Sequence, residues 1–248
     1  MLSANEIQIL SDAGFGQDVG QFIRSHTSKP IERTSPHAAF SGEAEKMAAI
    51  SMPVSDGEEA EKLFDLIQPG LISRGHLAFW SKRHEQDGRR VGDELIVLRT
   101  DDDRDIIRYC QTDGANYDVT TADILDRLQE WRFASKFDIV GADHDFVMLK
   151  FTRLPERLCD FAAEVDAFCP DAAGQGVAVD PKFNTPTNLN AAAQLCPEVK
   201  VKPRDMPQEV LEQLGDEFLE MYLDDARKNV RLLALKLRKS KELFLWWD

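Results

Sequence analysis

The chain has 248 residues, with 44 acidic and 30 basic side chains and a formal net charge of −14. This charge argues against binding to nucleic acid, whose phosphates require concentrated positive charge, and against binding to anionic membrane surfaces. A hydrophobic fraction of 43% without any apolar run of about 18 residues predicts a folded, soluble protein that lacks a transmembrane helix.

The cysteines and the N-terminus point to a reducing compartment. The chain begins without the basic and apolar regions of a secretory signal, so we predict a cytoplasmic protein. Its four cysteines are scattered without a CxxC pair and are therefore expected to be reduced thiols. We predict no metal site and no cofactor, because the sequence shows no cluster with zinc-ligand spacing. The cysteines are Cys110, Cys159, Cys169 and Cys196.

The first 46 residues differ in pattern from the rest of the chain. Residues 1–25 carry a weak helical pattern, and residues 26–46 are polar and contain two prolines, which is typical of a connector. We therefore predict that residues 1–46 form a helical appendage with a connector. Residues 47–248 are expected to form a single domain.

From residue 47 onwards, short strands alternate with helices. Residues 47–54 predict a strand, and the helix that follows is expected to begin at Ser55 as N-cap, with Glu58 three positions later. Strands are predicted over 76–81 and 94–100, joined by a charged loop.

The second half of the chain continues this alternation. Its expected elements are a helix over 101–111, a loop over 112–118, a helix after the capping pair Thr120 and Asp123, a hairpin of strands 137–142 and 146–151, and a helix opened by Pro155. Proline-rich residues 171–206 predict one long irregular arm. Residues 207–239 predict an amphipathic helix, either continuous or broken near Asp224-Asp225, and residues 243–247 a last strand. This order favours an α+β fold, with helices packed on a mixed or mainly antiparallel sheet built from hairpins.

Several segments together resemble a known family. These are the FDIVGA hairpin segment (137–142), the FCPD segment (168–171) followed by Gln175-Gly176, and the terminal LFLWWD (243–248). In combination they resemble the bacterial family known as domain of unknown function 4253, over about residues 48–248. The arm before the last helix is longer than the family pattern. The resemblance implies no established activity, cofactor or catalytic residue.

The loop TDGANYD, residues 112–118, is the best local candidate for a binding surface or an active site. Loops carry function more often than core segments do. The alternative is a tight turn in which Gly114 or Asn116 takes a positive φ. The candidate side chains of the loop are Asp113, Asn116, Tyr117 and Asp118.

Two further candidates, Asp171 and Trp247, lie near the ends of the FCPD and LFLWWD segments. Cys169, beside Asp171, needs a nearby base and a lowered pKa to act as a nucleophile; the alternative is a buried structural cysteine. Trp246 and Trp247 would face opposite sides of a strand, so one is expected in the core, unless they form an aromatic contact surface. The turn Asp143-His144-Asp145 is expected to be solvated rather than metal-binding.

The sequence lacks the common nucleotide-binding, zinc-protease, hydrolase and EF-hand motifs. We therefore predict a non-catalytic protein-interaction module, adaptor- or immunity-like, whose acidic surface binds a basic protein partner. The alternative is an enzyme with an unrecognised site around the TDGANYD loop. In that case the loop side chains and Asp171 would converge in one concave pocket. The oligomeric state is left open.

Overall fold

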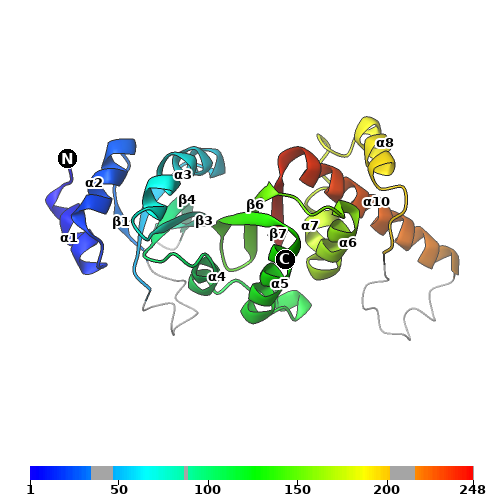
Figure 1. Cartoon of the computed structure of the whole chain (residues 1–248), viewed down its shortest axis with the longest axis horizontal. Helices are drawn as coiled ribbons and strands as arrows, with labels where there is room; N and C mark the ends of the chain where they lie inside the picture. Colours follow the sequence, from blue (N-terminus) through cyan, green and yellow to red (C-terminus); the bar gives the residue numbers. More distant parts are fainter. Residues whose placement is uncertain (35–46, 87–88, 202–215, 248) are drawn as a thin grey trace. The chain divides into compact units, whose positions relative to one another are not determined.

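The computed structural model describes residues 1–34, 47–86, 89–201 and 216–247. The described strands form a seven-stranded mixed sheet in the order β1-β2-β4-β3-β5-β6-β7, with helices packed around it (Figure 1). The predicted α+β fold is thus confirmed. Of the helices in the described segments, none has the length and apolarity that a bilayer-spanning helix requires.

The chain divides into two compact units. Unit 1 comprises residues 1–113, 119–126 and 138–148, and unit 2 comprises residues 114–118, 127–137 and 149–248. The elements of unit 1 are α1 (Ala4–Asp12), α2 (Gln17–His26), β1 (Glu32–Arg33), β2 (Ala49–Val54), α3 (Gly57–Ile72), β3 (Leu77–Gln86), β4 (Arg89–Leu98) and α4 (Arg104–Cys110), together with parts of α5 (Thr121–Ala134), β5 (Lys136–Ala142) and β6 (Phe146–Arg153). Strands β1, β2, β4 and β3 pair antiparallel, whereas β3 pairs parallel with β5.

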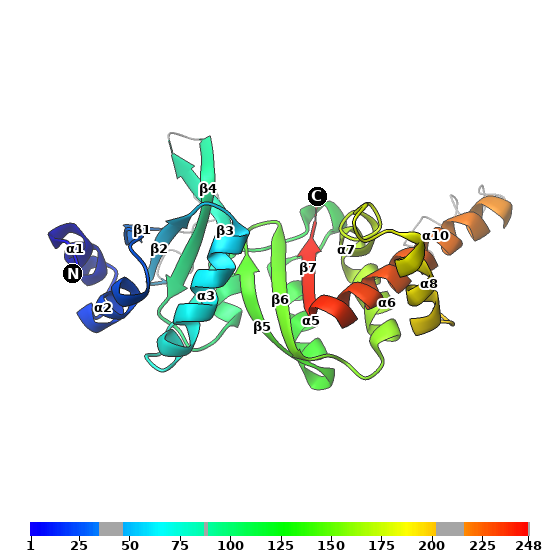
Figure 2. The same cartoon turned by 90° about the horizontal axis from the view of Figure 1, so that it is seen from above.

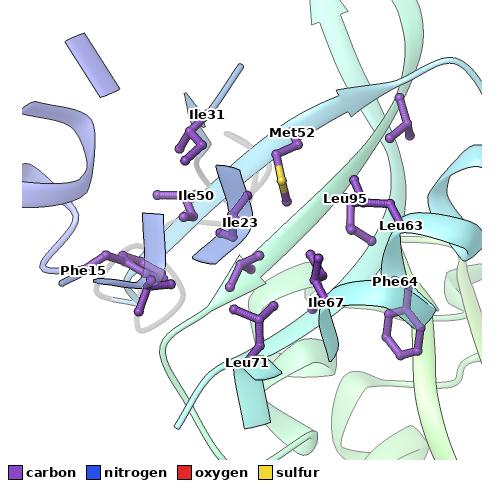
Figure 3. Packing of buried hydrophobic residues seen from close by; sticks show 14 of the residues in the cluster. Phe15, Ile23, Ile31, Ile50, Met52, Leu63, Phe64, Ile67, Leu71 and Leu95 are labelled. Atoms are coloured by element: carbon purple, nitrogen blue, oxygen red, sulfur yellow. The ribbon is translucent and has the colours of Figure 1, made fainter. Parts of the chain in front are cut away.

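The core of unit 1 lies between α3 and the sheet. Leu63, Ile67 and Leu71 recur at helical spacing on α3 and are buried in one cluster with Met52 of β2 and Leu95 of β4 (Figure 3). Each such side chain contributes roughly 1.5–3 kcal/mol when fully buried. Helices α1 and α2 and the residues beside them add further members to the same cluster, namely Ile9, Leu10, Phe15, Val19, Ile23 and Ile31.

Two local predictions for unit 1 need correction. The N-cap of α3 is Asp56, which accepts a hydrogen bond from the amide of Glu59, so the cap lies one residue beyond the predicted Ser55. Glu59 in turn accepts hydrogen bonds from the amide and hydroxyl of Ser55, at 2.7 and 2.9 Å. The charged segment between the two predicted strands is also mostly strand, because β3 extends to Gln86 and β4 begins at Arg89.

Unit 2 is mainly helical. Besides the remaining parts of α5, β5 and β6, it contains α6 (Leu158–Phe168), α7 (Pro170–Gly174), α8 (Pro186–Leu195), α10 (Asp216–Ser240) and β7 (Glu242–Trp246). Helix α10 packs against α6, α7 and α8 (Figure 2). It is continuous over 216–240, so the break near Asp224-Asp225 is absent from it, whereas residues 207–215 of the predicted helix lie outside the described residues.

The last strand is confirmed. Burial alternates along β7, with Leu243 and Leu245 inside, as a strand with one covered face requires. The amide of Phe151 in β6 donates to the carbonyl of Lys241, directly before β7, at 2.7 Å. Trp247 is buried and Trp246 is half-buried.

The predicted irregular arm over 171–206 is partly helical in its described part, whereas residues 175–185 and 196–201 belong to no helix. Helices α7 and α8 both lie mainly within it. Thr185 caps α8 by accepting from the amide of Asn188, and Pro186 occupies the first turn. Proline is well accommodated there because the first amides of a helix have no intrahelical partner. Residues 202–206 lie outside the described residues.

The prediction of four reduced thiols is also wrong. Cys159 and Cys196 form a disulfide that joins the start of α6 to the end of α8, with their Cα atoms 5.8 Å apart. The two residues are 37 positions apart in sequence. The helices that carry them, α6 and α8, both pack against α10 in unit 2. Cys110 and Cys169 are buried and take no part in this disulfide.

Candidate functional site

The TDGANYD loop forms a short 3₁₀ helix, η2 (Ala115–Tyr117). The residue with a positive φ is Asp118, at 55°, so the prediction of Gly114 or Asn116 for this position is wrong. Aspartate tolerates the left-handed region because its short side chain bonds to nearby backbone. Asn116, Tyr117 and Asp118 are exposed.

Two of the candidate residues meet directly. The phenol of Tyr117 donates a hydrogen bond to Oδ2 of Asp171 at 2.8 Å, across 54 positions of sequence. Asp171 is only 4% exposed, and its Oδ1 accepts a second hydrogen bond from Nε2 of Gln175 at 2.7 Å. Both oxygens of this buried carboxylate are thus paired, as the cost of burying a charge demands.

Cys169 is a structural partner of the last strand. Its thiol donates to the carbonyl of Trp246 at 3.0 Å, and its sulfur accepts from the amide of Trp246 at 3.2 Å. Burial raises the pKa of the Cys169 thiol to about 12. Because the thiolate is the nucleophilic form, this side chain is not activated for nucleophilic attack at neutral pH.

Trp247 is the terminal indole that meets the core. It is 4% exposed, and its ring stands perpendicular to that of Phe168, with centroids 5.8 Å apart. Gly114 lies against its face: a Cβ atom at Gly114 would be 2.6 Å from Cδ1 of Trp247. Only glycine fits at this position while the indole stays in place.

These contacts join the TDGANYD, FCPD and LFLWWD segments within unit 2. We call this set the motif junction; its members are Gly114, Tyr117, Cys169, Asp171, Gln175 and Trp247. Its polar groups satisfy one another, which is the arrangement of a structural contact. Asp113 belongs to unit 1, where its amide donates to the carbonyl of His144 at 2.9 Å. Of the predicted site residues, the structure therefore brings Tyr117, Asp171 and Trp247 into one junction.

The Asp143-His144-Asp145 turn in unit 1 is solvated only in part: His144 is exposed and Asp145 is half-buried, but Asp143 is buried, contrary to the prediction. Asp143 is 4% exposed, and its carboxylate accepts from the hydroxyl of Ser81 at 3.1 Å and from the amide of His144 at 2.8 Å. The hydroxyl of Thr112 donates to its carbonyl at 2.7 Å. Asp143 therefore stabilises the hairpin turn from inside the protein.

Unit 2 contains a cleft that sequence reasoning missed. It has a volume of about 700 Å³ and lies between the end of α5, the β6–α6 connection and the first turns of α6. We call it the α5–α6 cleft. It is lined by Glu130, Trp131, Phe133, Ala134, Arg153, Leu154, Pro155, Glu156, Arg157, Asp160, Phe161 and Glu164.

The aromatic residues of the α5–α6 cleft differ in burial. Trp131 and Phe161 are buried and pack edge to face, with ring centroids 5.1 Å apart. Phe133 is 81% exposed. The sequence signal was available: Phe133 follows Trp131 by two positions, so it cannot share the buried face of α5.

Carboxylates outnumber guanidinium groups along the α5–α6 cleft. Three of its charged residues are paired: Arg157 lies 2.5 Å from Asp160, and Glu130 lies 2.8 Å from Arg127, which is outside the lining. Glu156 and Glu164 are exposed and form no ion pair with any residue that the structure describes. The cleft thus combines aromatic and aliphatic side chains with charged ones, among which carboxylates are in excess.

No curated protein and no solved structure matches this chain. A family model described as domain of unknown function (DUF4253) matches residues 94–248, which include the motif junction and the α5–α6 cleft. Residues 48–93, which we expected to share the resemblance, lie outside the match. Because the match spans more than half of the chain, the protein belongs to the DUF4253 family.

Proposed function

We propose that this protein is a non-catalytic protein-interaction module, adaptor- or immunity-like, whose binding surface is the α5–α6 cleft. The observation that carries the proposal is Phe133, an aromatic side chain 81% exposed beside buried Trp131 and Phe161 in a cleft of about 700 Å³. An exposed apolar side chain of this size contributes little to the stability of the isolated chain. Aromatic residues in apolar clefts are typical of interaction surfaces.

The geometry of the motif junction favours a structural role over catalysis. The enzyme alternative requires reactive groups that converge and stay available to a substrate. Tyr117 and Asp171 converge, but each hydrogen-bonds to the other, and Gln175 occupies the second carboxylate oxygen. None of the predicted site residues lines the α5–α6 cleft. We infer that the junction positions the last strand, and that exposed Asn116 and Asp118 are contact residues at most.

The charge of the chain supports a basic partner. A formal charge of −14 attracts cationic proteins over distances longer than any contact and accelerates their encounter. The disulfide between α6 and α8 favours a compartment that oxidises thiols, which weighs against the cytoplasm predicted from the sequence.

Site-specific photocrosslinking tests this proposal in cells that naturally make the protein. A photoreactive phenylalanine analogue replaces Phe133 in one variant and Val179, a second exposed apolar residue of unit 2, in a control variant. We expect a discrete protein adduct at position 133 that the control lacks. Equal labelling at both positions, or no protein adduct at position 133, would refute the proposed function.

A further inference from the structure

We infer that the occupant of the α5–α6 cleft is a cationic segment of a partner protein, which places one large apolar side chain against Phe133 and surrounds it with lysine or arginine. This inference rests on the proposed function and adds the chemistry of the partner. It is carried by the shape, the rigidity and the charge of the cleft.

The apolar part of the cleft is formed in advance of binding. The ring of Trp131 packs edge to face on Phe161 and on Phe168, with centroids 5.1 and 5.9 Å away, so its position is fixed from two sides. Pro155 is also buried, and Leu154 is half-buried. A surface that is already ordered loses little conformational freedom on binding, which favours affinity.

The size of the cleft suits a side chain together with the backbone around it. Its volume of about 700 Å³ lies within the range of roughly 300–1,000 Å³ that ligand sites occupy. Phe133 lines the cleft and is 81% exposed, so its ring is available to an inserted side chain. An apolar anchor from a partner would thus contact aromatic surface on more than one side.

Charge complementarity selects the flanking residues of the partner. Apart from the paired residues Arg157, Asp160 and Glu130, the charged residues that line the cleft are Glu156, Glu164 and Arg153, which form no ion pair within the described parts of the chain, so negative charge is in excess. Glu164 follows Asp160 by one turn of α6 and lies on the same side of the helix. Exposed charges contribute modestly to affinity and are screened by salt, so they determine selectivity while the anchor provides most of the binding.

Peptide selection provides the test. A random dodecapeptide library is displayed on phage and selected on the immobilised full chain, and the enriched peptides are titrated by fluorescence anisotropy. We expect peptides with net positive charge and a large apolar residue. Their affinity should fall about tenfold or more with Phe133→Ser, the loss typical of an anchoring aromatic. The double charge reversal Glu156→Lys/Glu164→Lys should weaken binding and reduce its dependence on salt.

Matched controls separate the cleft from the general charge of the chain. Glu198→Lys changes an exposed glutamate of unit 2 outside the cleft and should leave peptide affinity unchanged. Thermal melts of all variants should match the parent, because Phe133, Glu156 and Glu164 are exposed.

Each other outcome overturns the inference. Enriched peptides that are neutral or acidic, or that bind the double reversal as well as the parent, exclude a cationic segment. Enrichment of no peptide, or of peptides indifferent to Phe133, excludes a linear segment in this cleft. If light scattering shows a dimer that Phe133→Ser dissociates, a second copy of the chain is the occupant. A crosslink at position 133 in cells preserves the proposed function in all three cases, whereas its absence refutes that function itself.

Discussion

One added methyl group at Gly114 tests whether the motif junction holds the end of the chain in place. The Cβ of an alanine would lie 2.6 and 2.7 Å from Cδ1 and Cγ of Trp247, whereas ordinary van der Waals contact begins at 3.4 Å. Backbone conformation is not the obstacle, because Gly114 has a φ of −125°, which alanine adopts freely. The indole must therefore move by most of an ångström.

The packing around Trp247 determines how much stability the Gly114→Ala change costs. The indole is 4% exposed and stands against the ring of Phe168, so it has little free space into which to move. Overpacking of this kind costs about 1–3 kcal/mol, so Gly114→Ala should lower the free energy of unfolding by that amount. Truncation by Trp247→Ala should cost more, about 3–5 kcal/mol. In a chain of this length, each kcal/mol lowers Tm by roughly 2–4 °C.

Urea unfolding followed by circular dichroism measures these changes. Gly57→Ala is the matched control, because its Cβ also faces an indole, that of Trp80, but at 3.3 Å and at the start of α3. It should change stability by no more than about 0.5 kcal/mol. The double variant Gly114→Ala/Trp247→Leu should lose less free energy of unfolding than the two single variants lose together, because leucine removes the clash between the alanine Cβ and the indole. Equal stability of Gly114→Ala and Gly57→Ala would refute the reasoning.

Three further predictions concern single interactions. Tyr117→Phe removes the hydrogen bond that the phenol donates to buried Asp171 and should destabilise the protein by about 1–3 kcal/mol in urea unfolding; an unchanged midpoint would contradict this. Reduction of the disulfide should lower the free energy of unfolding by about 2–5 kcal/mol, and a thiol assay on the denatured, unreduced chain should find two free thiols, not four. Hydrogen bonds from the Ser55 amide and from Lys29 lower the pKa of Glu59 to about 2, so its stabilisation is present above the ordinary pKa of 4.5 and is lost as pH falls towards 2. Glu59→Gln should therefore cost about 0.2–1 kcal/mol at pH 7, a value limited by the exposure of the pair, and nothing near pH 2; a pH-independent difference would argue against this ion pair.

The sequence alone was sufficient to predict elements that depend on residues close to one another in the chain. The composition of residues 243–247, rich in aromatic and aliphatic side chains, predicted the last strand. The structure shows the alternating burial that such a strand requires, with Leu243, Leu245 and Trp247 buried. The capping pair Thr120 and Asp123 was likewise readable, and their mutual hydrogen bonds are present.

The sequence alone was insufficient to predict features that depend on contacts between segments far apart in the chain. The prolines of residues 171–206 suggested irregular chain, but Pro186 opens α8, and the pairing of Cys159 with Cys196 depends on that helix. The bond between Tyr117 and Asp171 depends on how α7 packs, which no local spacing reveals. The α5–α6 cleft was missed for the same reason, since its walls come from two separate segments, residues 130–134 and residues 153–164.

A chain of aromatic rings connects the motif junction with the α5–α6 cleft inside unit 2. Trp247 packs edge to face on Phe168, Phe168 on Trp131, and Trp131 on Phe161, with centroid distances of 5.8, 5.9 and 5.1 Å. Of these four rings, those of Trp131 and Phe161 line the cleft, whereas those of Phe168 and Trp247 do not. Phe168 does not line the cleft but packs on Trp131, and so helps to fix the position of the Trp131 ring in it.

Replacing Phe168 with leucine should alter binding without touching the ligand. Leucine removes the edge-to-face contacts on both sides and leaves Trp131 less firmly oriented, so cleft-selected peptides should bind roughly 2- to 30-fold more weakly, the range of 0.5–2 kcal/mol that such indirect contacts transmit. Affinity is compared at a temperature well below the melting transition of each variant, so that lost stability is not mistaken for lost binding. Phe183→Leu, which removes a half-buried phenylalanine elsewhere in unit 2, should leave affinity unchanged. Equal affinity of the Phe168→Leu variant and the parent would show that the motif junction and the cleft are independent, and that the junction serves folding alone.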